Sequence, residues 1–344
     1  MLSGVVSQVL PGRGSMTEAA VPAGVAGFAA EPVVIVDRVT KRYGSNVVLD
    51  GASARVQPGV TGLLGANGAG KTTLIGMLLG LHRPDAGTLT VLGQEPVRSF
   101  RSVPLPIGYA PEHHSLPVDV PAVDLVEHMT TVQGLPRAEA SGRASDAMWY
   151  VGLGEERQRP LGTMSTGQRQ RVKLALAIAH DPKLVILDEP TDGLDPTQRE
   201  TMLDLIRRIS TDFGISVLLS SHLLDEVERT CHDVVILAEG RVVANGPISE
   251  LRGEGRGVSV ELDADPSVIA RELVRRGLQV SVERHRLVVQ LAAGATAQAP
   301  ASAIATQEDL LRLIRDLVSD HGLGIRRLAP RTVSLEEFYL QVGR

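Results

Sequence analysis

The chain has 344 residues, of which 43% are hydrophobic and 22% charged, and its formal net charge is −5. This composition is typical of a folded protein with one large domain and a smaller one, and it argues against a nucleic-acid partner, which usually requires a basic face. A single cysteine, Cys231, excludes an internal disulfide framework and fits a reducing cytoplasm. No stretch approaches the roughly 20 apolar residues of a membrane-spanning helix.

Residues 1–30 are rich in Ala, Gly, Val and Pro. A signal peptide is disfavoured because a basic n-region is missing and because Pro11, Glu18 and Pro22 interrupt any apolar core. We therefore expect a disordered leader over residues 1–30, with Met16 as an alternative start.

The folded pattern begins after Glu31. Residues 33–39 and 47–49 predict two strands, separated by a turn at residues 41–44 that carries Tyr43. Tyr43 could pack at an edge strand or stack on a purine ring, and composition alone favours packing.

A phosphate-binding loop of the form G-x-x-x-x-G-K-[ST] follows at residues 65–72. A predicted buried strand at 60–64 precedes it and a predicted buried helix at 73–79 follows it, which is the context such a loop needs. The backbone of the loop and the helix N-terminus would wrap phosphate oxygens, Lys71 would reach the β- and γ-phosphates, and the Thr72 hydroxyl would ligate Mg²⁺. The predicted nucleotide contacts here are Gly65, Ala66, Asn67, Gly68, Ala69, Gly70, Lys71, Thr72 and Thr73.

Beyond the loop, residues 87–93 predict a strand, and residues 107–112 predict a short one that ends in the carboxylate of Glu112. Residues 119–160 change to helical periodicity, with Val123, Val126 and Met129 on one expected face. His113 and His114 are adjacent and lack partners in the sequence pattern, so a solvated turn is favoured over a metal site.

Residues 164–168 (Met-Ser-Thr-Gly-Gln) precede a predicted helix at 169–180, and residues 184–187 then predict a buried strand that ends in Asp188 and Glu189. An open α/β sheet presents its active site at this end of its strands, so Asp188 could hold Mg²⁺ and Glu189 could polarise an attacking water. An isolated Asp-Glu pair is more often a turn signal, but beside a phosphate-binding loop the catalytic interpretation is favoured. His222 follows another predicted strand, at 216–220, and falls on the same sheet edge.

Over residues 33–246 these motifs resemble the nucleotide-binding subunit of ABC transporters. The motifs occur in the family's order: the A-loop aromatic Tyr43, Walker A at 65–72, the Q-loop position Glu112, the signature at 165–168, Walker B at Asp188 and Glu189, the D-loop Asp195 and the switch histidine His222. The resemblance implies an α/β P-loop NTPase fold over residues 31–246, with a mixed sheet and a helical subdomain at about 113–180.

The resemblance also implies roles for individual residues. Tyr43, Ser165, Gly167, Gln168 and Asp195 would contribute to ATP binding, while Thr72, Glu112 and Asp188 would hold Mg²⁺. Glu189 would be the general base and His222 would contact the γ-phosphate. Two cassettes would clasp two ATP molecules head to tail and drive a separate membrane permease.

Two positions depart from the family pattern. Thr166 stands where the first glycine of the signature L-S-G-G-Q normally lies, and Glu112 stands where the Q-loop normally has glutamine. We expect Thr166 to lower nucleotide affinity and the charge of Glu112 to alter coupling. Because Glu189 and His222 are both present, we expect a site that can hydrolyse ATP.

The sequence after residue 246 predicts a small α+β domain of the ferredoxin-like, split βαβ type over residues 247–344. The expected elements are a strand at 258–262, a helix at 265–276, a hairpin of strands at 280–283 and 287–291, a linker-like insertion at 292–305, a helix from 306, a strand at 325–328 and a short helix from 334. An interaction or dimer-stabilising role is favoured over ligand sensing. Residues 334–340 resemble the tail of ATPase subunits that serve ABC-2-type exporters of drugs, antibiotics or lipids.

Together these features predict the ATP-hydrolysing subunit of a bacterial ABC exporter, peripheral on the cytoplasmic face of the membrane, paired with a second identical cassette and without a nucleic-acid partner. An ABC importer subunit is the nearest alternative. A DNA-repair or chromosome-organising ATPase would need a long coiled coil, and a translation factor of the superfamily would need two cassettes, whereas the sequence has no sustained heptads and one Walker A motif. A regulatory cassette without activity would be expected to lack Glu189 or His222.

Overall fold

The computed structural model describes residues 31–99, 106–112, 116–251, 254–290 and 307–332. The expected leader at 1–30, the histidine pair at 113–114, the linker-like insertion at 292–305 and the short helix from 334 lie outside the described residues.

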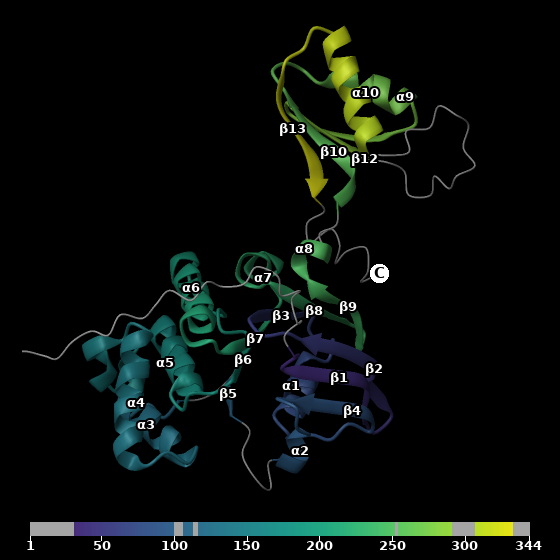
Figure 1. Ribbon diagram of the computed structural model, residues 1–344. Coiled ribbons are helices and arrows are strands. Elements are labelled where there is room, and N and C mark those ends of the chain that lie inside the picture. Colours follow the sequence, from purple (N-terminus) through teal and green to yellow (C-terminus); the bar gives the residue numbers. More distant parts are fainter. Residues whose placement is uncertain (1–30, 100–105, 113–115, 252–253, 291–306, 333–344) are drawn as a thin grey trace, which may run out of the picture. The chain divides into compact units, whose positions relative to one another are not determined.

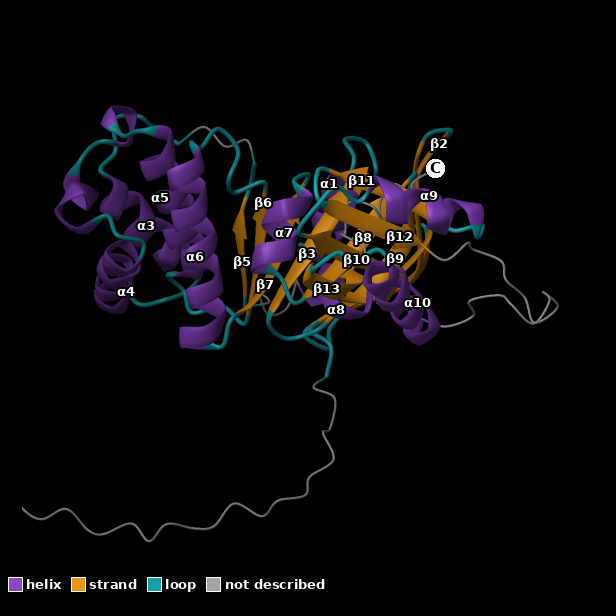
Figure 2. Ribbon diagram, turned by 90° about the horizontal axis from the view of Figure 1, so that it is seen from above, coloured by secondary structure: helices purple, strands orange, loops and turns teal. Residues whose placement is uncertain are grey.

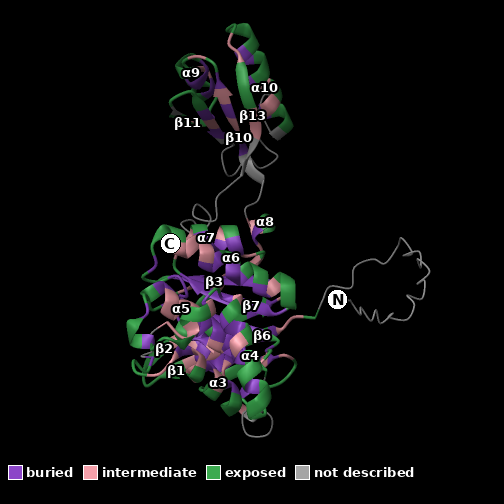
Figure 3. Cartoon of the chain, turned by 90° about the vertical axis from the view of Figure 1, so that its left-hand side faces the viewer, coloured by how far each residue is buried: buried purple, intermediate pink, exposed green. Residues whose placement is uncertain are grey.

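A six-stranded sheet in the order β5-β6-β7-β3-β8-β9 forms the centre of the cassette (Figure 1). Its strands are β3 (Val60–Gly65), β5 (Ile107–Ala110), β6 (Leu184–Asp188), β7 (Ser216–Ser221), β8 (Asp233–Ala238) and β9 (Arg241–Pro247). Neighbouring strands run parallel except for β9, which is antiparallel to β8. Every residue of β3, β6 and β7 is buried, in agreement with their apolar sequences (Figure 3). Since β3, β6 and β7 are parallel, their carboxyl ends meet at one edge, where Gly65, Asp188 and Ser221 end the strands.

A three-stranded antiparallel sheet packs with the first helix of the cassette. It has the order β2-β1-β4, and its strands are β1 (Val34–Tyr43), β2 (Asn46–Val56) and β4 (Ala86–Val91). The turn expected at 41–44 is shorter in the structure, since pairing continues to Tyr43 and Asn46 and only the segment around Gly44 turns. The predicted length of this turn was wrong because the register of β1 depends on its pairing with β2, which the local sequence does not reveal.

Five further helices belong to the cassette core: α1 (Lys71–Leu78), α2 (Pro96–Ser99), α6 (Pro196–Phe213), α7 (Leu224–Thr230) and α8 (Ile248–Leu251). The sequence sets both ends of α6. Asp195 caps its first turn, Pro196 occupies the first helical position, and Gly214 ends it in the left-handed region with φ 65°. Ile248 packs in one apolar cluster with Leu64 and Val234, so cassette packing continues past residue 246.

The segment between β5 and β6 is helical. It contains α3 (Ala122–Val132), α4 (Arg137–Tyr150), the 3-10 turns η1 (Gly154–Gln158) and η2 (Leu161–Thr163), and α5 (Thr166–Ile178). Figure 2 shows α3, α4 and α5 grouped beside the β5 end of the sheet. The expected packing face of α3 was partly wrong: Ala122, Val126 and Thr130 are buried, whereas Met129 is 39% exposed. The face is set by where α4 and α5 approach, which the periodicity alone did not resolve.

The C-terminal elements form a second, separate sheet. They run β10 (Glu254–Leu262), α9 (Ser267–Arg275), β11 (Gln279–Glu283), β12 (Arg286–Gln290), α10 (Gln307–Asp320) and β13 (Ile325–Thr332). The sheet is antiparallel in the order β11-β12-β10-β13, and one apolar cluster joins its strands to α9 and α10 through residues such as Val260, Leu287, Leu273 and Ile314. This succession of elements is that of a split βαβ plan. Among the described helices, none is long and apolar enough to cross a membrane.

Candidate nucleotide-binding and catalytic site

A cleft of about 650 Å³ opens at the edge where β3, β6 and β7 end. It gathers segments that are far apart in the sequence: the start of β2, the phosphate-binding loop, Glu112 after β5, the end of β6 with the turn that follows it, and the residue after β7. The lining residues are Asn46, Val48, Ala66, Asn67, Gly68, Gly70, Lys71, Thr72, Thr73, Glu112, Asp188, Glu189, Asp192 and His222.

Glycines shape the phosphate-binding loop. Gly68 and Gly70 adopt φ 84° and φ 107°, in the region that favours glycine, and a Cβ at Gly70 would lie 2.7 Å from Leu49 Cδ2. Gly70 is also the N-cap of α1, so the first N–H groups of that helix, which no helical carbonyl can accept, point out of its N-terminus. A loop and helix start of this form favours an anion. Gly65 and Ala69 belong to the loop but are not among the residues that line the cleft.

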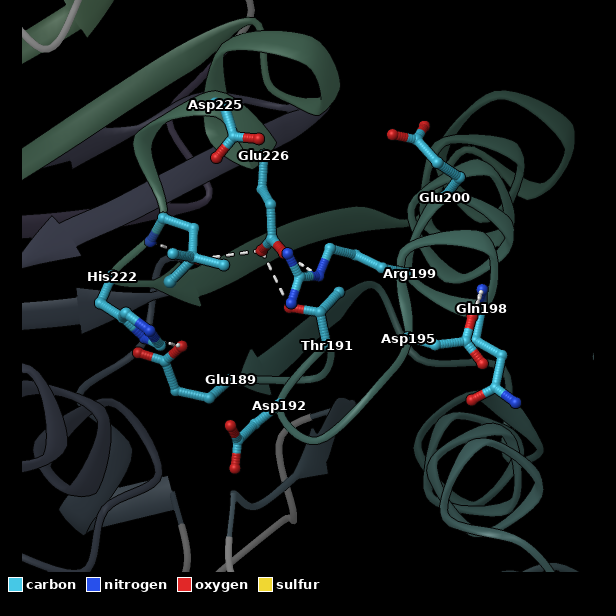
Figure 4. A network of polar contacts seen from close by, with 12 residues as sticks. Glu189, Thr191, Asp192, Asp195, Gln198, Arg199, Glu200, His222, Asp225 and Glu226 are labelled. Carbon is cyan, nitrogen blue, oxygen red and sulfur yellow. Dashed lines mark hydrogen bonds and ion pairs between the residues drawn. The ribbon is translucent and has the colours of Figure 1, made fainter.

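Lys71, Glu189 and His222 form a line of polar contacts in the cleft. Lys71 Nζ donates a hydrogen bond to the carbonyl of Gly65 at 2.6 Å and lies 3.6 Å from Glu189 Oε1. The second carboxylate oxygen of Glu189, Oε2, lies 2.9 Å from His222 Nδ1, as Figure 4 shows. The side chains of Lys71 and Glu189 are each only 9% exposed, whereas that of His222 is 51% exposed. Glu189 therefore lies between a buried cation and an imidazole that remains open to solvent.

Glu189 has an unusual backbone conformation for a residue that is not glycine. Its φ is 48°, its N–H donates to the carbonyl of Ser220 at 3.1 Å, and its carbonyl accepts the N–H of Asp192 at 3.1 Å. Residues held in this region cost on the order of 1 to 3 kcal/mol and occur often at functional sites. The turn directs the Glu189 side chain to the cleft immediately after the buried strand β6.

Asp188 is the last residue of β6 and is 5% exposed. Burial raises the pKa of its carboxyl, the neighbouring carboxylates of Glu112 and Glu189 raise it further, and Lys71 opposes the shift. Thr72, Glu112 and Asp188 all line the cleft and supply hydroxyl and carboxylate oxygens. Such hard oxygen donors fit Mg²⁺, which takes one or two carboxylates together with substrate phosphates rather than a complete protein cage. No cluster of three or more His, Cys, Asp or Glu suited to a metal ion occurs in the described parts of the chain.

The residues of the signature do not line this cleft. Ser165 caps α5: the Gln168 N–H donates to Ser165 Oγ at 3.2 Å, and the Ser165 N–H donates to Gln168 Oε1 at 2.9 Å. Gly167 faces Gln198 so closely that a Cβ would lie 2.7 Å from Gln198 Oε1. Thr166 occupies the first turn of the same helix, where its Oγ1 accepts a hydrogen bond from Arg169 at 3.4 Å.

Asp195 and Tyr43 also lie outside the lining of the cleft. Asp195 accepts the Gln198 N–H at 2.9 Å and thereby caps α6. The Tyr43 ring is 46% exposed and meets the His82 ring edge-on at 6.0 Å, with Lys41 Nζ 5.5 Å from its centroid.

Sequence reasoning missed a buried carboxylate, Glu226, that joins segments beside the cleft (Figure 4). Its side chain is fully buried, and its Oε2 accepts hydrogen bonds from Thr191 Oγ1 at 2.8 Å and Ser221 Oγ at 3.0 Å. Arg199 Nε lies 3.1 Å from Oε1 in an ion pair. Burial raises the pKa of Glu226, while the two hydroxyl donors and Arg199 lower it. Because Thr191 follows Glu189 and Ser221 precedes His222, Glu226 holds the two segments that place these side chains.

Asn46, Val48 and Asp192 were missed as well. They line the cleft, but they come from the start of β2 and from the turn after β6, and only the assembled fold brings them there. Their residue types carry no motif, so no signal in the sequence could have identified them.

Comparison with known proteins identifies the family. The family model described as ABC transporter matches residues 49–192. The Nod factor export ATP-binding protein I of Ralstonia nicotianae is 34% identical over 226 residues, 65% of this chain and 70% of that protein. A daunorubicin resistance ATP-binding protein of Streptomyces coeruleorubidus is 34% identical over 254 residues, 74% of this chain and 78% of that protein.

A solved structure of an ATP-binding subunit of an ABC transporter matches with a TM-score of 0.57 and 29% identity, and the match covers 64% of this chain and 92% of that chain. The family model, the relatives and the shared fold all agree with the order of the motifs along the sequence and with the residues that line the cleft. The chain therefore belongs to the ABC transporter family and is one of its ATP-binding ATPase subunits.

Proposed function

We propose that this chain hydrolyses ATP to power a separate membrane permease, as the ATPase subunit of a bacterial ABC exporter. The observation that carries the proposal is the cleft that gathers the phosphate-binding loop, the Asp188–Glu189 pair and His222. Export is favoured over import because the two relatives described above are named for Nod factor export and for daunorubicin resistance.

In this proposal the phosphate-binding loop and the start of α1 bind the phosphates of ATP. The lining residues of the loop and helix start, at 66–68 and 70–73, would supply backbone N–H groups, and Lys71, whose side chain is buried, would supply a positive charge. Tyr43 would stack on the purine ring, a use that the exposure of its ring permits.

Thr72, Glu112 and Asp188 would hold Mg²⁺ at the phosphates, and bound Mg²⁺ would neutralise negative charge on the β- and γ-phosphate oxygens. Glu112 replaces the amide of the family's usual glutamine with a carboxylate, which adds negative charge to this donor set.

Glu189 would act as the general base. It would accept a proton from the water that attacks the γ-phosphorus, while the bond between that phosphorus and the ADP oxygen breaks. The contact between His222 Nδ1 and Glu189 Oε2 at 2.9 Å orients both side chains, so that His222 can contact the γ-phosphate and align the water. Positioning and charge neutralisation supply most of the rate in reactions of this kind.

A second cassette would complete each site. Ser165, Gly167, Gln168 and Asp195 lie outside the cleft of their own chain, so we assign them to the ATP bound by a partner cassette, an identical copy in the simplest case. A solved dimeric bacterial ABC transporter cassette shares the fold, with a TM-score of 0.55 and 21% identity.

The remaining assignments concern the setting of the cassette. We propose a cassette over residues 31–246, against which α8 also packs, and an accessory α+β domain within residues 247–344, after a leader at 1–30. An integral membrane permease would be the partner, with this subunit peripheral on the cytoplasmic face of the membrane. No nucleic-acid partner is expected, given the net charge of −5.

ATP hydrolysis by the purified chain tests the proposal through two site variants. Lys71→Ala should lose ATP binding and turnover, and Glu189→Gln should bind ATP, form an ATP-dependent dimer in size-exclusion chromatography and turn over at least about a hundredfold more slowly. Lys183→Ala, at an exposed lysine that does not line the cleft, is the matched control and should behave as wild type. Full turnover by Lys71→Ala would contradict the role of Lys71 in binding the phosphates, and full turnover by Glu189→Gln would contradict the role of Glu189 as general base.

A further inference from the structure

Acidic side chains outnumber basic ones among the residues that line the cleft. Among its described lining residues, Glu112, Asp188, Glu189 and Asp192 carry carboxylates, whereas the basic side chains are Lys71 and His222. A triphosphate is itself a polyanion, so these four carboxylates repel it unless positive charge lies close by. The carboxylate of Glu112 adds to this repulsion.

A second buried lysine contacts the segment that carries Glu112. Lys173 belongs to α5, the helix that begins at the signature, and it is 9% exposed. Its Nζ donates hydrogen bonds to the carbonyl of Glu112 at 2.8 Å and to that of Pro111 at 3.2 Å. The ammonium thus fastens the segment after β5 to the signature helix.

The same stretch of α5 also contacts the segment that carries Asp192. Gln170, three residues before Lys173, donates from Nε2 to the carbonyl of Asp192 at 3.3 Å. Burial lowers the pKa of Lys173, and the carboxylates of Asp192 and Glu112 oppose that shift. Lys173 is therefore a buried ammonium that bonds the backbone of Glu112, on a helix that also bonds the backbone of Asp192 through Gln170.

We propose that Lys173 is a positioning residue of the nucleotide site: it fixes the Pro111–Glu112 backbone against the signature helix, and its charge balances Glu112 and Asp192 so that the acidic cleft accepts ATP. Lys173 is not among the lining residues, so it acts through its two acidic neighbours and not by touching the nucleotide. The inference rests on the proposed function, because it assumes that the cleft binds ATP.

Binding of a fluorescent ATP analogue to the full chain tests the role, measured with Mg²⁺ and with EDTA. Lys173→Met keeps the length of the side chain and removes its charge, and we expect the Kd in EDTA to rise on the order of tenfold. The rise should be smaller with Mg²⁺, which supplies positive charge of its own. Lys173→Arg should stay within about threefold of wild type because it keeps the charge. Lys183→Met, at an exposed lysine, is the control and should not change the Kd.

Repeating the measurement in a chain that already carries Glu112→Gln distinguishes a role of the Lys173 charge from a role of its packing. In a Glu112→Gln chain one of the two acids is gone, so Lys173→Met should raise the Kd in EDTA by clearly less than it does beside Glu112. An equal cost in both backgrounds, or a Lys173→Met chain that binds like Lys183→Met, would overturn the proposal.

Two further outcomes are decided by the same set of proteins. If circular dichroism shows that Lys173→Met alone does not fold, the double variant with Glu112→Gln should fold and bind ATP. Failure of the double variant to fold would contradict a balance of charge.

If the wild-type chain shows no saturable binding that Lys71→Ala abolishes, the proposed function itself fails. That outcome is distinct from failure of the Lys173 assignment.

Discussion

At the scale of single residues, the site is held by buried charged side chains whose partners come from other segments. Glu226 accepts hydrogen bonds from Thr191 and Ser221 and pairs with Arg199, although it is fully buried. Removing one member of such a group leaves the others without compensation, which costs more than a surface contact does.

Glu226→Ala should therefore lower the free energy of unfolding by about 2 to 4 kcal/mol, measured by urea denaturation. Part of the loss is relieved because the Arg199 side chain is 33% exposed and can turn to water. Glu200→Ala is the matched control: Glu200 is 47% exposed, pairs with Arg229 at 2.6 Å and should change the stability by less than about 1 kcal/mol. Equal and small losses in both variants would show that the buried network does not hold these segments.

The positions of site residues were predictable where a motif ties a residue type to the end of a strand. Lys71, Asp188, Glu189 and His222 were expected at one sheet edge, and the structure places all four along one cleft. Glu226 was not predictable, because an acidic residue on a short helix is usually solvated and its burial follows from the packing of α7. The left-handed φ of Glu189 was likewise invisible in the sequence.

At the scale of elements, the approach of α5 to β5 decides how closely the helical segment packs on the sheet. Gly108 in β5 lies directly beneath α5, and a Cβ there would be 1.8 Å from the carbonyl oxygen of Ala177. Only a glycine lets the helix backbone come this near the strand.

Gly108→Ala should destabilise the protein by about 3 kcal/mol or more, because the strand or helix must shift to admit the methyl group. Gly142→Ala is the matched control, since Gly142 lies within α4, where an added methyl group would meet no atom within 4 Å, and this variant should gain about 0.5 to 1 kcal/mol. Thermal and urea unfolding of both variants make the comparison. A Gly108→Ala protein as stable as Gly142→Ala would mean that this contact does not limit the packing.

The sequence predicted the type and order of the helices and strands well. It predicted the ends of these elements and the buried faces of the helices less well. Buried parallel strands were visible as short apolar runs, and α6 was marked at its start by Asp195 and Pro196. The extent of the turn before β2 and the buried face of α3 depend on neighbouring elements, so periodicity alone placed Met129 inward when it is exposed.

At the scale of the whole molecule, the motif residues of the ATP-binding subunit lie in two different places. Lys71, Glu189 and His222 share the cleft, while Ser165 and Asp195 cap helices outside it. The order of motifs allowed this division to be predicted through the resemblance to the family. The sequence after residue 246 allowed the order of the C-terminal elements to be predicted, but it names no ligand or partner for them.

The most direct test of the central claim is to identify what this chain binds in its native host. The chain is tagged, membranes are solubilised in mild detergent, and the proteins that co-purify are identified and quantified by mass spectrometry, with the Lys71→Ala chain as a parallel sample. We expect a polytopic membrane protein in near-equal amount with this subunit. Recovery of soluble partners, ribosomes or DNA alone would contradict the claim that the cassette powers an exporter.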